Sequence, residues 1–375
     1  MADIYILGDI CPHWGNTKQF QTGEPEAVFH DILPLLQQAD AVVANMEAPI
    51  TSSEQKLAKT SMNLKADAKD LALLKASGIG YLSLANNHIL DFGTQGLTDT
   101  LEHIAENEMG SFGAGTVEEA KEPLILKVEE KTIAFLSFAE QEFNCAVDYE
   151  VGANLWDDLD SIVQIRRAKE ACDYLVVLYH GGIEQYIYPS PLLQKKCRAM
   201  IAAGADFVTC QHSHCVGTKE KYQGGEILYG QGNCVFGYAA GNEQWNTGLI
   251  LQLDVQEDVL KVRYIPIEAR EDGEYLMDEK KAAEFLDNID RLSQQITDSD
   301  FLYKQWQAFC EKQKNDYLPL LLGWDRVANK LNRMSGGKLI SLFFKQPSKR
   351  NVMNIIRCVS HREVITTILE KENGL

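Results

Sequence analysis

The sequence predicts an α/β protein that continues into a helical C-terminal extension. Up to about residue 267, short apolar runs typical of buried strands alternate with stretches in which apolar residues recur every three or four positions. After about Arg270, only the helical pattern continues. We therefore expect a catalytic domain over residues 1–269 and a helical region over residues 270–375.

Strands and helices alternate along the first region. The apolar runs predict strands over residues 4–7, 41–44, 81–84, 124–128, 132–138, 174–179, 206–210, 226–229, 248–255 and 259–267. The helical pattern covers residues 26–38, 67–77, 97–106, 161–170 and 191–203. Thr116 and Glu119 have the spacing of a capping box, which predicts a further helix after a Gly-rich turn.

The second region is predicted to contain helices alone. An amphipathic helix is expected over residues 282–296, another from about Asp300, and a last one from Ser360 to Lys371. Residues 326–362 hold nine Lys or Arg and no Asp or Glu. This basic stretch is either a docking face for an anionic polymer, a membrane or an acidic partner, or a face that packs on the acidic domain.

Composition limits the classes of function. The chain has 375 residues, of which 45% are hydrophobic and 24% charged, as in a soluble globular protein. Its net charge of −18 argues against nucleic-acid binding and against simple electrostatic docking on anionic lipid. No signal peptide or transmembrane segment is predicted, and the nine Cys are scattered without a paired framework, so we expect a cytoplasmic protein with reduced thiols.

Polar side chains follow the first three predicted strands. Asp9 comes after the first strand, Glu47 after the second, and Asn87 and His88 after the third, with Asp91 three residues later. The carboxyl ends of strands are where α/β proteins hold their ligands. Carboxylates, an amide oxygen and an imidazole can bind a metal, although a turn capped by Asn or Asp explains each motif taken alone.

Histidines follow two later strands in the same way. His180 ends the most apolar run of the chain, and His212-Ser213-His214 follows the run over residues 206–210. Two His that are two residues apart in a loop can bind one metal or two adjacent metals. Together, five strand ends offer the mixed nitrogen and oxygen ligands of a site with two divalent ions, for which Mn, Fe or Zn are most suitable.

In this order and spacing, the motifs resemble the bacterial capsule-synthesis family of the CapA or poly-γ-glutamate-synthesis type, a branch of the calcineurin-like metallophosphoesterases. The resemblance covers roughly residues 3–267 and also includes Gly113-Ala114-Gly115 and Gly232-Asn233. It implies a four-layer α/β/β/α metallophosphoesterase-like sandwich with the metals at one edge of the sheets, and the helical C-terminal extension follows it in the chain.

The resemblance also implies a role for each polar residue. Glu47 would bridge the two ions. The other ligands would be Asp9 and His214 for one ion, and Asn87, His180 and His212 for the other.

His88 would contact the phosphoryl oxygen or protonate the leaving group, with Asp91 orienting the ring. Cys11 stands where the wider superfamily often has a His, and is either a thiolate ligand or inert. Glu184 and Asn233 are further candidates for ligands or for residues that support them.

These expectations favour a hydrolase that acts on a phosphoester or a related bond, within the biosynthesis of capsule, poly-γ-glutamate or another bacterial surface polymer. Its ligand would be an anionic or phosphorylated small molecule or polymer. The alternatives are a non-catalytic assembly or binding factor in polymer synthesis, and a cytoplasmic phosphodiesterase unrelated to capsule. The helical region would form a homo-oligomer or hold a partner of the biosynthetic complex.

Overall fold

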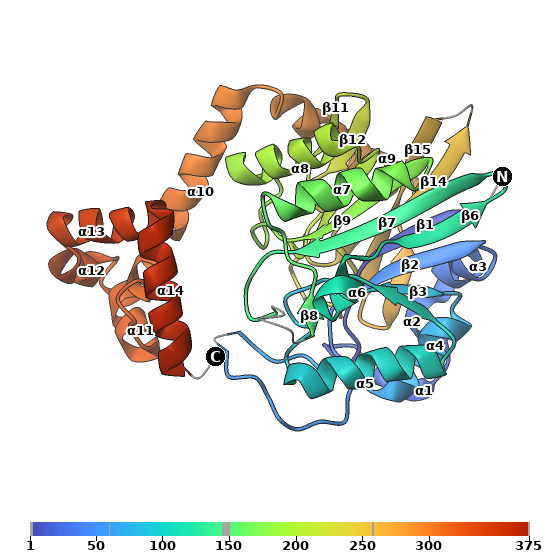
Figure 1. The fold of residues 1–375 in the computed structure, drawn as a ribbon, viewed down its shortest axis with the longest axis horizontal. Coiled ribbons are helices and arrows are strands. Elements are labelled where there is room, and N and C mark those ends of the chain that lie inside the picture. Colours follow the sequence, from blue (N-terminus) through green and yellow to red (C-terminus); the bar gives the residue numbers. More distant parts are fainter. Residues whose placement is uncertain (1–2, 60, 145–150, 257–258, 374–375) are drawn as a thin grey trace. The chain divides into compact units, whose positions relative to one another are not determined.

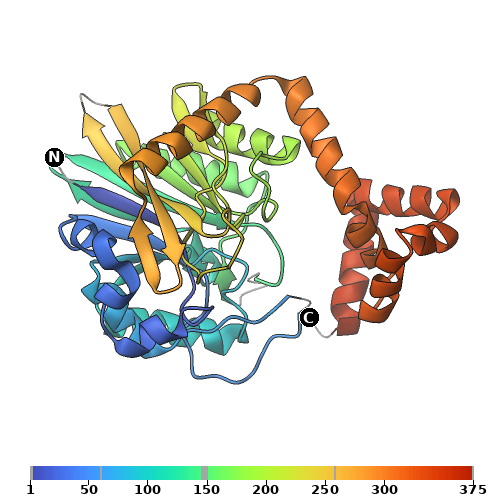
Figure 2. The ribbon, with the colours of Figure 1, turned by 180° about the vertical axis from the view of Figure 1, so that it is seen from behind.

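The computed structural model describes residues 3–59, 61–144, 151–256 and 259–373. Contacts between Cα atoms group the chain into two compact units, residues 1–302 and residues 303–375. Figures 1 and 2 show the ribbon from opposite sides, with two sheets in the first unit and helices in the second. Of the predicted loop over residues 145–160, positions 145–150 lie outside the described residues.

Two sheets form the centre of the first unit. The eight-stranded sheet has the order β16-β15-β14-β1-β2-β3-β4, with β13 paired to the end of β1. Its strands are β1 Ile4–Ile10, β2 Ala41–Met46, β3 Tyr81–Ser83, β4 Gly110–Phe112, β13 Asn233–Val235, β14 Thr247–Gln256, β15 Val259–Arg270 and β16 Gly273–Leu276. In this sheet, β1, β2, β3 and β4 are parallel neighbours.

The second sheet has the order β11-β12-β10-β9-β7-β6. Its strands are β6 Leu124–Val128, β7 Lys131–Ala139, β9 Tyr174–His180, β10 Phe207–Gln211, β11 Lys219–Tyr222 and β12 Gly225–Leu228. A separate pair joins β5 Ala114–Gly115 to β8 Gly152–Ala153.

Helices cover the outer face of each sheet. The first sheet packs on α1 Thr17–Thr22, α2 Glu26–Phe29, the 3₁₀ turn His30–Ile32, α3 Leu33–Gln37, α4 Ala68–Ala76 and α5 Gly93–Glu106. The second sheet packs on α7 Asp160–Glu170 and α8 Pro191–Ala203, while the short α6 Val117–Lys121 lies beside β5. The predicted four-layer α/β/β/α arrangement is therefore confirmed (Figure 1).

Strand β9 shows how the sequence specifies these layers. Because side chains alternate between the two faces of a strand, Leu175 and Val177 pack under the helices, whereas Val176 and Leu178 pack against the other sheet. All four residues are fully buried. An uninterrupted apolar run is what a strand covered on both faces requires.

Residues 270–302 differ from the helix-only prediction. Strand β16 pairs with β15, so the prediction is wrong over residues 273–276. Helix α9 Glu279–Gln295 places Ile289 in the core between the sheets, and Ile296 and Leu302 join the core of the second sheet. The domain boundary after residue 269 stays a prediction, while the contacts divide the chain after residue 302.

The predicted helix over residues 26–38 is broken into three short pieces. His30 has a left-handed φ of 36°, and Pro34 opens the third piece, where its missing N–H costs no helical hydrogen bond. The capping box of Thr116 and Glu119 is confirmed. A helical periodicity alone does not reveal such breaks, because apolar residues still face the core on either side.

The second unit consists of α11 Arg326–Met334, α12 Lys338–Phe343, α13 Gln346–Arg357, α14 Val359–Asn373 and most of α10 Ser299–Leu320. Few of its described side chains are buried, and these include Asn332, Ile340 and Phe344. Asn332 accepts a hydrogen bond from the Ile340 backbone and donates to the Asn315 carbonyl oxygen, which ties α12 to α10. Among the described residues, no helix is long and apolar enough to cross a membrane.

Candidate metal centre

The carboxyl ends of strands from both sheets meet at one site. Asp9 lies in β1, Glu47 directly follows β2, and His180 ends β9. His212 and His214 follow β10, Asn87 and His88 follow β3, and Asn233 begins β13, where its Cα pairs with that of Asp9. The structure thus brings together every metal ligand that the sequence predicts.

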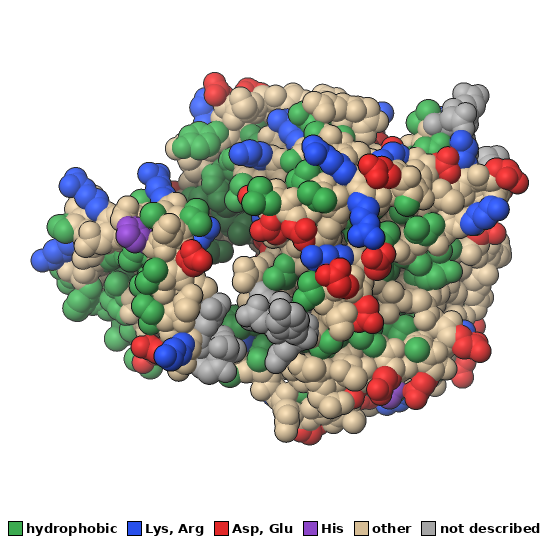
Figure 3. Space-filling view, viewed as in Figure 1, with side chains coloured by type: hydrophobic (Ala, Val, Ile, Leu, Met, Phe, Trp, Pro, Cys, Tyr) green, Lys and Arg blue, Asp and Glu red, His purple; other side chains and the backbone are tan. Residues whose placement is uncertain are grey.

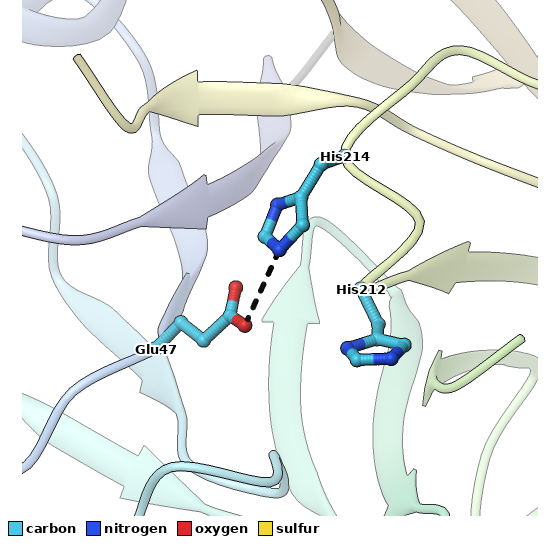
Figure 4. A group of neighbouring side chains, drawn as sticks. All are labelled: Glu47, His212 and His214. Atoms are coloured by element: carbon cyan, nitrogen blue, oxygen red, sulfur yellow. Dashed lines mark ion pairs between the residues drawn. The ribbon is translucent and has the colours of Figure 1, made fainter. Parts of the chain in front are cut away.

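Glu47 lies at the centre of this site. Its Oε1 atom is 3.5 Å from His180 Nε2 and 3.9 Å from His214 Nε2. The side chain is fully buried, and neither carboxylate oxygen has a hydrogen-bond partner among the described residues. Figure 4 shows the Glu47 carboxylate and the His214 ring pointing toward each other, with the His212 ring beside them.

At this site, two groups of side chains offer ligand atoms that lie within 4.8 Å of one another. One group is Asp9, Glu47 and His180, and the other is Glu47, His212 and His214. Glu47 belongs to both, which is the arrangement that a bridging carboxylate needs. The family-based mapping pairs Asp9 with His214, whose Nδ1 atom lies 3.8 Å from Asp9 Oδ2, and this assignment stays a prediction.

The electrostatics of Glu47 favour a bound cation. Burial and the neighbouring Asp9 carboxylate raise the pKa of Glu47 well above its usual value, and His214 partly opposes the rise. A buried, unpartnered carboxylate is costly, and a divalent ion would stabilise its charged form. The residues present therefore fit a metal centre.

Asp9 is held by two donors. Asn45 Nδ2 donates to its Oδ1 at 2.7 Å, and the His212 backbone N–H donates to its Oδ2 at 2.9 Å. Asn45 Nδ2 also lies 3.2 Å from His180 Nδ1. These contacts fix the Asp9 carboxylate between the two sheets, and they show Asn45 as a supporting residue that the strand-end pattern does not single out.

His212 and His214 reach the site from a strained loop. Their φ angles of 85° and 48° lie in the left-handed region, which is uncommon for residues other than glycine. His214 Nδ1 donates to Asn233 Oδ1 at 2.8 Å, so the Nε2 atom that faces Glu47 is free to bind a metal. Asn233 is thus placed to orient a ligand.

The surroundings of His212 disfavour its protonated form. Its Nδ1 atom is buried without a hydrogen-bond partner among the described residues, and its ring centroid lies 5.0 Å from that of His180. Burial and the neighbouring histidines hold the pKa of His212 well below its usual value. A neutral imidazole is the form that binds metals.

Asn87 approaches the same region. Its Oδ1 atom lies 3.0 Å from His180 Nε2, and its Nδ2 donates to Glu142 at 3.4 Å. Glu142 also lies 4.0 Å from His212 Nε2. Glu142 lies three residues after β7 ends at Ala139, and the sequence analysis did not single it out although it follows a predicted strand.

His88 and Asp91 form a pair, as expected from their spacing. His88 Nδ1 donates to Asp91 Oδ2 at 2.7 Å. Burial lowers the pKa of His88, and the hydrogen bond to Asp91 opposes this effect. With Nδ1 held by the carboxylate, Nε2 is the ring nitrogen available to a substrate.

Lys59 is the main residue that the sequence analysis missed. Its Nζ atom contacts Asp91 Oδ1 and lies 3.2 Å from His88 Nδ1, and the side chains of Lys59 and Asp91 are each only 1% exposed. The Asp91 backbone oxygen accepts from Leu57 N, and its Oδ2 accepts from Leu64 N. Asp91 therefore anchors Leu57, Lys59 and Leu64 beside His88.

Two other candidates lie outside both ligand groups. Burial and nearby acidic groups raise the pKa of the Cys11 thiol well above its usual value, and its Sγ atom lies 3.9 Å from the Pro12 oxygen. Glu184 is exposed, although its charge contributes to the raised pKa of Glu47. Among the described residues, neither has a contact that supports direct metal binding.

Comparison with known proteins identifies relatives over most of the first unit. The family model described as bacterial capsule synthesis protein PGA_cap matches residues 3–238. A PGA biosynthesis protein CapA from Bacillus subtilis is 32% identical over 236 residues, which are 62% of this chain and 62% of that protein. A capsule biosynthesis protein CapA from Bacillus anthracis is 31% identical over 219 residues, 56% of this chain and 53% of that protein.

Two more distant proteins are also similar. A probable polyglutamine synthesis accessory protein from Mycobacterium tuberculosis is 26% identical over 249 residues, 61% of this chain and 66% of that protein. The crystal structure of a hypothetical protein from Thermus thermophilus covers 72% of this chain and 100% of its own, with 16% identity and a TM-score of 0.45. The sequence matches thus cover between about half and two thirds of the relatives' own length.

Proposed function

This chain belongs to the bacterial capsule-synthesis family of the CapA and poly-γ-glutamate type, and from that premise we propose that it is a metal-dependent hydrolase. Its reaction would cleave a phosphoester or a related bond during the synthesis of a capsule or poly-glutamate polymer. Two divalent ions, with Mn, Fe or Zn as the most suitable, would be its cofactors.

The observation that carries this proposal is the Glu47 carboxylate. It is fully buried, has no hydrogen-bond partner among the described residues, and lies between His180 and His214. Divalent ions held there would polarise a phosphoryl group and lower the pKa of water. A carboxylate kept only for packing would need donors of its own.

The remaining residues suit an anionic substrate. His88, oriented by Asp91, would exchange a proton with the leaving group through Nε2. Lys56 lines a cavity of about 270 Å³ that also borders Cys11, Lys65 and the ion-pair partner of Lys65, Glu54. The ammonium group of Lys56 would attract a phosphorylated ligand. We also propose a cytoplasmic location, which the eight free cysteines among the described residues support.

The proposal is tested by turnover of bis(p-nitrophenyl) phosphate by the Mn²⁺-loaded full chain. Glu47→Gln should lower turnover by about 100-fold or more, because it removes the shared ligand of both groups. Glu274→Gln is the matched control, since Glu274 is also buried but belongs to neither ligand group. It should leave turnover within about twofold of the parent protein.

Equal turnover by the parent protein and Glu47→Gln would contradict the proposal. No turnover by the metal-loaded parent, across phosphomonoesters and phosphodiesters, would favour a non-catalytic binding factor instead. That alternative is consistent with the name of the Mycobacterium tuberculosis relative, which is called an accessory protein. Turnover without any effect of gene deletion on the surface polymer would favour a phosphodiesterase unrelated to capsule.

A further inference from the structure

The helices of the second unit expose large hydrophobic side chains. Met334 is 75% exposed and Phe343 is 64% exposed. The exposed apolar residues of α11 to α14 include Val327, Leu331, Met334, Leu342, Phe343, Met353, Ile356, Val359, Val364, Ile365 and Ile368. Single exposed apolar residues are normal, but a set of this size on consecutive helices marks a surface that binds something.

The exposed residues form stripes along the helices. In α11, Val327, Leu331 and Met334 follow the spacing of one helix face, and in α14, Val364, Ile365 and Ile368 do the same. Such stripes normally face a core, yet these side chains are between 40% and 75% exposed. The second unit therefore has helix faces that its own described residues leave uncovered.

Basic side chains accompany these stripes. Of the nine Lys and Arg in residues 326–362, all but Lys349 are exposed. Within the described parts of the chain, Arg333 is the member of this set that has an ion pair, with Asp316. Figure 3 shows hydrophobic and basic side chains next to each other across this helical unit.

The net charge of the whole chain does not reflect the charge of the second unit. Residues 303–375 carry 13 Lys and Arg against 6 Asp and Glu, whereas the whole chain carries 36 against 54. The net charge of −18 therefore belongs to the first unit and says little about the second. Electrostatic attraction acts over about 10 Å at 0.1 M salt, so the local charge decides what docks.

We propose that helices α11 to α14 dock on an anionic lipid surface. Exposed Leu, Ile, Phe and Met side chains need an apolar medium, and the interleaved Lys and Arg need negative headgroups. A polyanionic polymer would satisfy the charges but would leave the apolar side chains in water. A second copy of the chain would cover the apolar side chains but would bring two positive surfaces together.

Flotation of the full chain with lipid vesicles tests this proposal. The protein should float with vesicles of phosphatidylcholine and phosphatidylglycerol and stay behind with phosphatidylcholine alone. Leu331→Ser with Met334→Ser should lower the bound fraction about tenfold, because polar residues replace the apolar stripe of α11. Lys330→Glu with Arg350→Glu should lower it about tenfold as well.

Matched controls lie in the first unit. Leu159→Ser changes a side chain that is 83% exposed, and Lys18→Glu reverses an exposed charge, so neither should alter flotation. All the substituted residues are exposed, so circular dichroism and metal content should match the parent protein. This comparison separates lost docking from lost folding, and it does not depend on the hydrolase proposal.

Three results would overturn the proposal. The first is no flotation with anionic vesicles, and the second is equal flotation of the Ser and Glu variants and the parent. The third is binding of soluble poly-glutamate that competes with vesicles and is unaffected by Leu331→Ser with Met334→Ser, which would assign the surface to a polyanion. Concentration-dependent dimers that the same Ser variant abolishes would likewise overturn it and assign the surface to a second copy.

Discussion

The two units depart from the usual distribution of side chains in opposite ways. The first unit buries ionisable groups at the carboxyl ends of its strands, where Asp9, Glu47 and His180 are each at most 2% exposed. The second unit exposes apolar groups such as Leu331 and Met334. Both arrangements are unfavourable without a ligand, because buried charge needs a counter-charge and exposed apolar surface needs cover. This difference is the basis for proposing that the first unit binds metal ions and that the second unit docks on a lipid surface.

The largest expected effect tests how closely strands β13 and β14 pack in the first unit. A Cβ at Gly248 would lie 1.8 Å from the Asn233 carbonyl oxygen, so Gly248→Ala must displace the strand that supports His214. We expect it to lower the free energy of unfolding by about 5 kcal/mol or to prevent folding. A Cβ at Gly80 would have no atom within 4 Å, and urea unfolding of Gly80→Ala should show a change below about 1 kcal/mol.

Lys59→Met tests how much the buried ion pair of Lys59 and Asp91 stabilises the first unit. The substitution leaves the buried Asp91 carboxylate without its cation, and it should lower the free energy of unfolding by about 3 kcal/mol or more. Lys65→Met is the matched control in the same segment, because its partner Glu54 is 82% exposed, and its effect should stay below about 1 kcal/mol. Equal effects of the two substitutions on urea unfolding would argue against a buried Lys59–Asp91 anchor.

The contrast between the units is tested directly by one pair of leucines. Leu251 is fully buried between the sheets, and Leu251→Ala should cost about 3 kcal/mol of stability. Leu331 is 51% exposed, so Leu331→Ala should change the stability by less than about 0.5 kcal/mol. A large loss from Leu331→Ala would mean that this residue is buried in solution, and the proposed docking surface would then be wrong.

The smallest effect per measured step is that of one pH unit, acting through Glu47. Because the pKa of Glu47 is raised above its usual value of 4.5, the folded metal-free protein holds a proton there that the unfolded chain has lost. This contribution is fully present below about pH 4.5, and it is lost as the pH rises through the folded pKa. As the pH rises through that window, the free energy of unfolding of the metal-free protein should fall. The fall should be steeper than that of Glu47→Gln by up to about 1.4 kcal/mol per pH unit.

Urea unfolding of the metal-free proteins between about pH 5 and pH 8 measures this difference. Mn²⁺ should restore stability at the upper end of the range for the parent protein and for Glu274→Gln, but not for Glu47→Gln. Parallel pH profiles for the parent protein and Glu47→Gln would mean that burial of Glu47 does not raise its pKa in the folded protein.

The sequence predicted much of the site because strand ends follow a simple rule. Asp9, Glu47, His180 and the two histidines after β10 each follow an apolar run, and the carboxyl ends of parallel strands meet at one edge. Their positions around Glu47 are less predictable, because His212 and His214 reach it with a left-handed backbone. No apolar periodicity encodes that conformation.

Other structural features could not be predicted from the pattern of apolar and polar residues. Lys59 reaches Asp91 from a segment without regular structure, whose course is set by backbone hydrogen bonds from Leu57 and Leu64. In the second unit, Val327 and Leu331 are four residues apart on one face of α11, a spacing typical of a face turned toward a core, yet both side chains are exposed. Periodicity shows that a face is apolar, and tertiary structure decides what covers it.

Elemental analysis of the purified full chain after reconstitution with Mn²⁺ tests the central claim most directly. The parent protein should hold about two divalent ions per chain, and His180→Ala with His212→Ala should lose them, because one residue from each ligand group is removed. His103→Ala with His361→Ala is the matched control, since both residues lie outside these groups, and it should keep the ions. No bound metal in the parent protein, or equal metal in all three, would contradict the account.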